Sequence, residues 1–215
     1  RARQVATGWE VELRIAVDVI IPIERIFPLL ERFYATACST RVRLAAEVLG
    51  GSWDALTTGR ADLVIGAPGD MPARSGISSR KIGRSQLVFV VAPSHPLAAH
   101  LGPIPASELR RHRAVVIADT SQELTARTIG LLDGQDSLRV PDMQSKAKAQ
   151  IAGLGIGSLP HWLAEPEIAA GRLVVLTLEE PRPALDLSIA WRNRQVGKGL
   201  AWFLDALADP ASIAA

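Results

Sequence analysis

The chain of 215 residues is long enough for one large domain or for two small lobes. Hydrophobic residues make up 48% and charged residues 21%, a globular balance that excludes long disorder. Aromatic residues make up only 5%, so a stacking platform for single-stranded nucleic acid is not expected. The longest apolar runs are far shorter than the roughly 20 residues of a membrane span, so we expect no membrane contact.

The formal net charge of +2 does not come from one basic patch. Twenty of the 24 basic residues are arginines, and they are scattered; the densest groups are 110–113 and 192–194. A surface that binds duplex DNA needs several basic side chains on one face. We interpret the short groups as solvated charges at helix ends and expect that this chain itself does not contact DNA.

The apolar pattern changes between periods of two and of 3.6 residues along the whole chain. In the first part we expect strands at 11–17, 41–49 and 62–66 and helices at 21–37 and 52–58, with Ser52 as the cap of the second helix. After this part, we expect strands at 77–82, 86–92, 114–118, 138–140, 155–159, 173–178 and 185–191, and helices at 107–112, 120–133, 143–152, 160–170 and 196–208. The helix at 120–133 is expected because Thr120 and Glu123 have the spacing of a capping box.

This order of elements predicts an α/β protein with two Rossmann-like lobes around a cleft, with mixed, mainly parallel sheets. We expect residues 11–92 and 192–215 in the first lobe, residues 93–191 in the second, and residues 1–10 at the end of a linker helix. In such sheets, ligands bind at the carboxyl ends of the strands.

Motifs of catalysis are incomplete in this sequence. The glycine-rich run at 153–158 precedes a strand instead of joining a strand to a helix, so a dinucleotide site is not expected. His95, His100, His112 and His161 have no acidic or cysteine neighbours at metal-ligand spacing. The single cysteine, Cys38, excludes an intrachain disulfide, fits a reducing compartment, and ends an apolar helical pattern that indicates packing. We expect no enzyme, no metal and no cofactor.

Small and polar residues follow several of the expected strands, namely at 18–20, 66–68, 118–121 and 142–145. Backbone N–H groups at helix starts attract anions and polar ligand atoms, so these segments are candidates for a binding site. Each hydroxyl or carboxylate fits equally well as the cap of its own helix. The pattern nominates Asp18, Val19, Ala67 and Ala118 among the binding residues.

The run IAGLGIGSLP at 151–160, followed by WLA at 162–164 and AGRL at 170–173, resembles the effector-binding domain of LysR-type transcriptional regulators. Supporting motifs are GRADLVIG at 59–66 and VAPSHPL at 91–97, and the resemblance extends from about residue 12 to residue 207. It implies the fold of type 2 periplasmic binding proteins and a small-molecule effector bound between the lobes. It also implies a cytoplasmic homodimer or homotetramer, paired through helix 21–37 and a helix of the second lobe.

DNA would be bound by an N-terminal winged helix-turn-helix absent from this chain, with residues 1–8 as the tail of the linker. For the effector site, the resemblance implies Asp18, Ile20, Thr120, Ser121, Met143, Gln144 and Leu159, which precedes Pro160.

Asp18 departs from the family pattern, which commonly has a serine or threonine in this loop. A carboxylate would repel an anionic effector, so we expect an effector that is less anionic than usual or that carries an amine or hydroxyls. Unchanged effector affinity in an Asp18→Asn variant would contradict this expectation. Alternatively, Asp18 points away from the site and caps the helix that begins at Pro22.

A solute-binding protein of a transport system would share this fold, so the fold alone does not separate the two functions. The linker-like start, the lack of a signal segment and the single cysteine favour the regulator. An enzyme on the same scaffold would need a nucleophile or an acid–base pair that the sequence does not offer.

Overall fold

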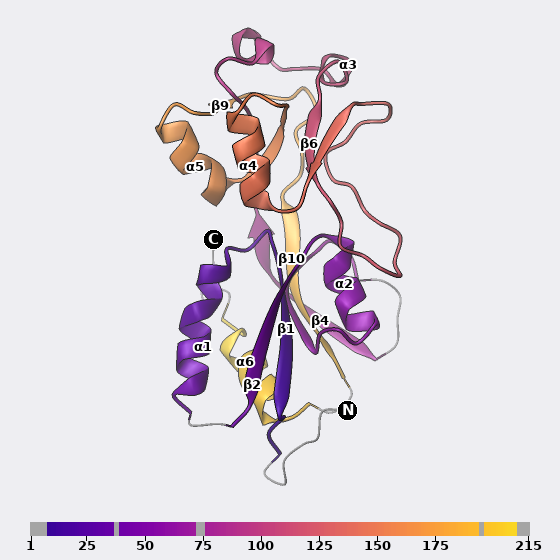
Figure 1. Ribbon diagram of the computed structural model, residues 1–215, viewed down its shortest axis with the longest axis vertical. Coiled ribbons are helices and arrows are strands. Elements are labelled where there is room, and N and C mark those ends of the chain that lie inside the picture. The colour runs from indigo at the N-terminus through magenta and orange to yellow at the C-terminus, as the bar shows by residue number, and fades with distance from the viewer. Residues whose placement is uncertain (1–7, 37–38, 72–75, 194–195, 210–215) are drawn as a thin grey trace. The chain divides into compact units, whose positions relative to one another are not determined.

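The computed structural model describes residues 8–36, 39–71, 76–193 and 196–209, in two compact units (Figure 1). Unit 1 contains residues 1–84, 119–126 and 186–215, and unit 2 contains residues 85–118 and 127–185. The sequence placed the boundaries at 92/93 and 191/192 and did not separate 119–126 from the second lobe. Most of the expected linker end, and Cys38, lie outside the described residues.

Unit 1 is built on a five-stranded sheet in the order β2-β1-β3-β10-β4. Its strands are β1 (Glu12–Asp18), β2 (Arg41–Glu47), β3 (Leu63–Pro68), β4 (Ile77–Ser85) and β10 (Leu185–Arg192). β1 runs parallel to β2 and β3, whereas β10 is antiparallel to β3. The carboxyl ends of β1, β2 and β3 therefore share one edge of the sheet.

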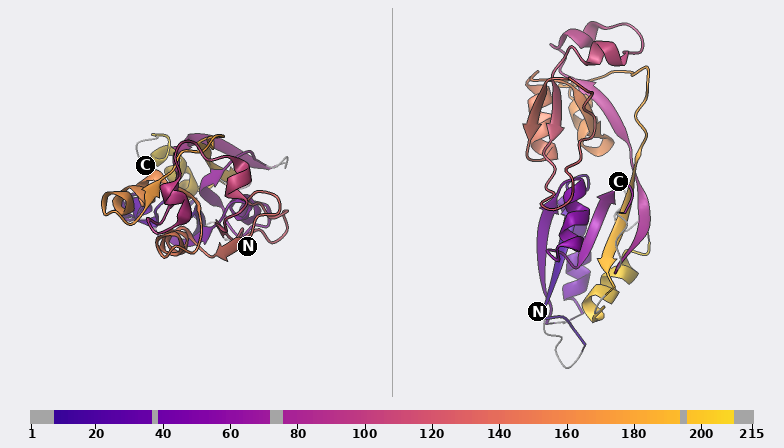
Figure 2. Two further views of the ribbon diagram at one scale, coloured as in Figure 1. Left: turned by 90° about the horizontal axis from the view of Figure 1, so that it is seen from above. Right: turned by 90° about the vertical axis from the view of Figure 1, so that its right-hand side faces the viewer.

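Helices cover both faces of this sheet (Figures 1 and 2). They are the 3₁₀ helix η1 (Ile23–Ile26), α1 (Phe27–Tyr34), α2 (Gly50–Thr57) and α6 (Lys198–Ala206). On one face α1 packs on α6, where the rings of Phe33 and Phe203 lie 4.8 Å apart. On the other face α2 buries Trp53 in a cluster with Ala16 and Val64.

Unit 2 contains the antiparallel sheet β8-β5-β9 and the parallel pair β6-β7. Its strands are β5 (Leu87–Val91), β6 (Ala114–Ile117), β7 (Ser137–Val140), β8 (Gly157–Pro160) and β9 (Val174–Val175). Its helices are η2 (Pro96–Ala99), α3 (Ala106–Leu109), α4 (Met143–Ile151) and α5 (His161–Ala169). Val90, Leu159 and Ala164 form part of the core with residues of α4 and α5. The expectation of an α/β fold with mixed sheets is confirmed.

Three expectations about local structure are wrong. Residues 120–133 form no helix: the amides of 122–124 donate instead to the carboxylate of Asp54, a partner far away in the sequence. Ser52 lies inside α2, and the residue before this helix is Leu49. The single helix expected at 21–37 is divided into η1 and α1, since Pro28 at the second position of α1 has no N–H to continue an earlier turn.

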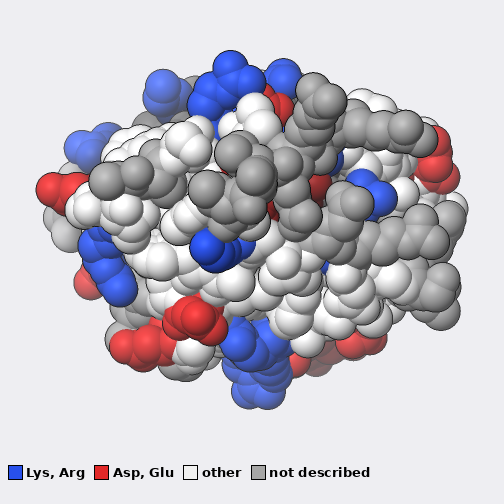
Figure 3. All heavy atoms as spheres, turned by 90° about the horizontal axis from the view of Figure 1, so that it is seen from below, with Lys and Arg blue, Asp and Glu red and all other residues white. Residues whose placement is uncertain are grey.

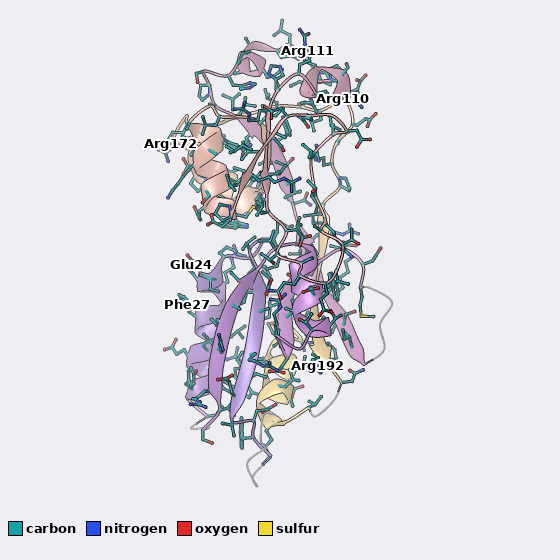
Figure 4. All side chains as sticks on the ribbon, turned by 45° about the vertical axis from the view of Figure 1, so that its right-hand side comes forward. Glu24, Phe27, Arg110, Arg111, Arg172 and Arg192 are labelled. Carbon is teal, nitrogen blue, oxygen red and sulfur yellow. The ribbon has the colours of Figure 1, made fainter. Side chains whose placement is uncertain are left out.

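Charged side chains do not gather in one basic area on the face shown in Figure 3, where acidic and basic groups are interspersed. Arg110 is the C-cap of α3 and Arg111 pairs with Glu108 at 3.2 Å, so both lie at a helix end; Arg192 ends a strand instead (Figure 4). Among the described helices, none combines the length and the apolar character that crossing a bilayer requires.

Candidate functional site

Asp18 ends β1 and points its carboxylate at the start of α2. Its Oδ2 accepts hydrogen bonds from the amide of Leu49 at 3.0 Å and from the hydroxyl of Ser52 at 2.7 Å. Its Oδ1 accepts from the amide of Ile20 at 3.0 Å, and the residue is only 2% exposed. The alternative that Asp18 caps the helix after Pro22 is wrong, because η1 has no side-chain cap.

The amino end of α2 is occupied by a carboxylate from residues 119–121, which belong to unit 1. Asp119 accepts hydrogen bonds from the amides of Gly50 and Gly51, both at 3.1 Å. The same carboxylate accepts from the amide and the hydroxyl of Ser121, each at 2.7 Å. The first N–H groups of a helix have no partner within it, so an acceptor at this position is stabilised by hydrogen bonds and by the helix dipole.

Thr120 joins the same segment to the end of β2. Its hydroxyl accepts from the amide of Val48 at 2.9 Å and donates to the carboxylate of Glu47. Arg60 pairs with Glu47 and, at 3.1 Å, with Asp54. The site therefore brings together acidic groups from β1, β2, α2 and the 119–121 segment, with one guanidinium among them.

Asp54 anchors the continuation of that segment. Its carboxylate is fully buried and accepts from the amides of Gln122 at 3.2 Å, Glu123 at 3.0 Å and Leu124 at 2.9 Å. Burial by itself raises the pKa of Asp54, but these amides and Arg60 outweigh that effect and hold the pKa below its usual value. The ionised carboxylate therefore ties residues 122–124 to α2.

The pH dependence of stability is expected to report on Asp18. Burial, together with the smaller effect of the charge of Asp119, raises its pKa from the usual 3.8 to about 7, although the hydrogen bonds from Ile20, Ser52 and Leu49 lower it. The folded state thus prefers the protonated carboxyl, whose stabilising contribution is complete below about pH 4 and is lost as the pH rises through about 7. Relative to an Asp18→Asn variant, the unfolding free energy of the native chain should fall by about 1.4 kcal/mol per pH unit between about pH 4 and 7.

Urea unfolding at several pH values measures this difference. The control is Asp136→Asn, which removes a carboxylate that is exposed. If the native chain and the Asp18→Asn variant give parallel curves from pH 4 to pH 8, the assignment to Asp18 is wrong.

The structure divides the predicted site residues between the two units. Unit 1 holds Asp18, Val19, Ile20, Ala67, Thr120 and Ser121, and unit 2 holds Ala118, Met143, Gln144 and Leu159. Asp18, Val19, Thr120 and Ser121 lie together at the strand ends described above, where the amide of Val19 donates to the carbonyl of Glu47. Ala67 and Leu159 are fully buried in hydrophobic clusters, so their side chains serve the core. Gln144 is exposed at the start of α4, next to the partly buried Met143.

Sequence reasoning missed Glu47, Gly50, Gly51 and Asp54 as parts of this site. Asp119 lay within the nominated segment 118–121 but was not named as a binding residue. The adjacent glycines carried a signal, because paired glycines indicate a close approach of another chain segment. Asp54 carried none, since the three amides that it accepts from lie about 70 positions away. Among the described residues, no group of three or more His, Cys, Asp or Glu is arranged to hold a metal ion.

Comparison with known proteins identifies the family. Residues 6–211 match the family model described as the LysR substrate binding domain. The chain belongs to this family. It is 39% identical over 212 residues to the HTH-type transcriptional regulator YeeY of Escherichia coli K12, covering 96% of this chain and 67% of the relative. It is 36% identical over 213 residues to the regulator PunR of the same strain, covering 99% and 69%.

The fold comparison agrees with the sequence comparison. The effector-binding domain of QuiR in complex with shikimate matches with a TM-score of 0.67 at 16% identity, covering 91% of this chain and 94% of that one. The LysR resemblance and the type 2 periplasmic-binding-protein-like fold are therefore confirmed. The chain is the effector-binding domain of a LysR-type transcriptional regulator, a class of protein that binds small-molecule effectors, forms oligomers and binds DNA through a helix-turn-helix domain.

Proposed function

We propose that this LysR-type domain senses its effector at the amino end of α2, by exchange with the chain's own residues 119–121. The observation that carries the proposal is the carboxylate of Asp119 on the amides of Gly50 and Gly51. The carboxylate of Asp119 and the hydroxyls of Thr120 and Ser121 are the same polar groups that a small hydroxylated acid or amide would bring to the site. The segment acts as an internal ligand.

The glycines of α2 support this assignment, because they leave room only for such an occupant. A Cβ on Gly50 would lie 2.5 Å from the hydroxyl oxygen of Ser121, and one on Gly51 would lie 1.8 Å from that of Thr120. Real Cβ atoms do not approach oxygen so closely. A Cβ on Gly51 would also lie 2.9 Å from the backbone carbonyl carbon of Thr120, so a larger residue at position 51 would displace the segment. Leu49, just before the helix, has a φ of 52°, a conformation that costs free energy in a residue other than glycine and is typical of functional sites.

Exchange at this site offers a physical route to regulation. The 119–126 segment belongs to unit 1, but the residues on both of its sides, 118 and 127, belong to unit 2. An effector that replaces the segment would release a piece of chain that unit 2 carries at both ends. An effector can shift such an equilibrium only by its different affinities for the two states, and competition with the segment supplies that difference.

Variants of the internal ligand test this proposal. A small-molecule library is screened by thermal shift on the native chain, and the affinity of each hit is then measured for Asp119→Ala and Gly51→Ala. Because the internal competitor is weakened, Asp119→Ala should bind the effector at least fivefold more tightly. Gly51→Ala should bind it at least tenfold less tightly, since the new methyl group fills the site.

The exposed Asp136→Ala is the matched control and should leave the affinity within twofold. An effector that binds Asp119→Ala less tightly than the native chain, or that ignores the Gly51→Ala substitution, contradicts exchange at α2. The Asp18→Asn variant also tests whether Asp18 selects an effector with an amine or hydroxyls, because its affinity for such a hit should fall.

We infer that the domain senses its ligand without converting it, and that it works in the cytoplasm, where the DNA of a bacterial regulator lies. The curated relatives support regulation over transport, because they are named transcriptional regulators. Recovery of the bound effector chemically unchanged is the expected result, and turnover would favour an enzyme. A bound ligand with no effect on DNA binding by the full-length protein would not be the effector.

A further inference from the structure

Unit 2 buries the cationic side chain of Lys146 on α4, and the charge of Arg182, in the loop before β10, acts on it. Lys146 is only 7% exposed, whereas Lys148 on the same helix faces solvent. Within the described part of the chain no carboxylate pairs with Lys146, and the charge that acts on its ammonium group is that of Arg182. Burying two like charges together is unfavourable unless an opposite charge joins them.

The Arg182 guanidinium is only partly used by the protein. Its Nη2 donates to the carbonyl of Gly130 at 3.1 Å, while its buried Nε has no hydrogen-bond partner. Proline on either side, at 181 and 183, restricts the backbone and so helps to hold the side chain in place. A fixed guanidinium with an unused donor is suited to an anionic acceptor.

Gln150 adds a second unsatisfied atom one helical turn after Lys146. Its amide nitrogen donates to the carbonyls of Val90 at 3.2 Å and Gly157 at 2.8 Å, but its Oε1 is buried without a partner. Buried polar atoms without partners are rare in native proteins and indicate a place that water, an ion or a ligand completes.

Glycine residues border both cations. A Cβ on Gly157 would lie 3.4 Å from Cε of Lys146 and 3.4 Å from the amide nitrogen of Gln150. A Cβ on Gly130 would lie 3.0 Å from Nη1 of Arg182. A side chain at position 130 would therefore crowd the guanidinium of Arg182, whereas one at position 157 would be in ordinary contact with Lys146 and Gln150.

Both cations keep their charge at neutral pH. Burial, together with the charge of Arg182, lowers the pKa of Lys146 to about 8, so the ammonium form still dominates at pH 7. Burial also lowers the pKa of Arg182, but a guanidinium remains protonated over the whole physiological range.

We propose that Lys146 and Arg182 form an anion-binding site of unit 2 that takes the carboxylate or phosphate group of a small organic ligand. The guanidinium offers its free N–H, and the ammonium group offers the remaining donors and the second charge. This proposal depends on the proposed function at one point only: it takes the ligand that carries the anionic group to be the effector. Binding of the anion itself does not depend on what happens at α2.

Calorimetric titration of the whole chain tests the site, with inorganic phosphate and succinate as probes and sodium chloride holding the ionic strength constant. At least one probe should bind saturably, and the ratio of the two affinities separates a phosphate site from a carboxylate site. Lys146→Met and Arg182→Gln should each lower the affinity at least tenfold, because each removes one of the two charges. Lys148→Met, on the exposed side of the same helix, should stay within twofold of the native value.

Thermal unfolding separates a binding role of Lys146 from a merely structural one. Without an anion, Lys146→Met should melt at the same temperature as the native chain or higher, because a buried unpaired charge has been removed. The stabilisation by phosphate or succinate should disappear. A clear destabilisation of the Met variant with unchanged anion affinity overturns the proposal, as does the absence of saturable binding to the native chain.

The Asp119→Ala variant keeps this proposal separate from that of exchange at α2. The part of its phosphate or succinate binding that Lys146→Met or Arg182→Gln removes should be as tight as in the native chain, because the cation pair lies on other elements. If the anion binds as expected and only the effects of Asp119→Ala and Gly51→Ala on effector affinity are missing, exchange at α2 is wrong and the anion site stands.

Discussion

Replacing Asp54 with alanine is expected to lower the free energy of unfolding by about 3–5 kcal/mol. The carboxylate accepts hydrogen bonds from three consecutive amides, at 122–124, and pairs with Arg60. Its removal leaves three N–H groups without their acceptor and leaves Arg60 paired with Glu47 alone. Unfolding in urea measures the loss, and hydrogen exchange at the same amides should become faster than in the native chain.

The Arg14–Asp62 pair supplies the control for this experiment. Asp62 also pairs with an arginine on unit 1, at 2.6 Å, but its side chain is 25% exposed, and its bonds go to Arg14 in β1 and not to residues 122–124. Asp62→Ala should cost only about 1 kcal/mol and leave exchange at 122–124 unchanged. If Asp54→Ala is no worse than Asp62→Ala, the 119–126 segment is not anchored as described.

A Phe27→Asp substitution is expected to weaken self-association at least a hundredfold. LysR-type regulators form oligomers, and α1 has an apolar stripe on its outer side as well as on its inner side. Ile26, Leu29 and Phe33 are buried against unit 1, yet Phe27 is 51% exposed, Tyr34 is 50% exposed and Ile23 is 36% exposed. Phe27 and Tyr34 lie on α1, seven positions or two helical turns apart, and Ile23 lies in η1, four positions before Phe27, so the three form one outer stripe. Phe27 points outward, as does the neighbouring Glu24 (Figure 4).

The size of the effect follows from symmetry. In a two-fold dimer each substitution occurs twice, so two aromatic anchors are lost and two carboxylates are placed in an apolar contact. Sedimentation velocity over a concentration series measures the change. Leu101→Asp is the control, because Leu101 is 93% exposed and isolated in unit 2. An unchanged dissociation constant for Phe27→Asp would exclude α1 from the interface.

Local patterns were sufficient for most of the helices and strands. Alternation over 11–17 and 41–49 predicted β1 and β2, because successive side chains of a strand point to opposite faces of the sheet. The spacing of Ile26, Leu29 and Phe33 predicted the inner face of α1 in the same way. The motif at 151–160 indicated the family, because its glycines suit backbone conformations that few other residues adopt. The family in turn implied the two-part fold.

The site was predictable only in part. Asp18, Thr120 and Ser121 were nominated because polar residues follow the expected strands and because the family resemblance implies them; their role in effector binding stays a prediction. Lys146 and Arg182 were not found, since neither the burial of a lysine nor its distance from an arginine 36 positions later can be read from a local pattern.

By itself, the sequence determined the α/β class, the family and most element positions, because these depend on residue spacing and on short motifs. Only the tertiary structure decided that 120–133 is not a helix, although Thr120 and Glu123 have the spacing of a helix cap. The carboxylates of Asp54 and Glu47 offered the backbone and hydroxyl of this segment better partners than a helix would have. A choice between local and distant hydrogen bonds is made by the folded neighbours, and no window of the sequence contains them.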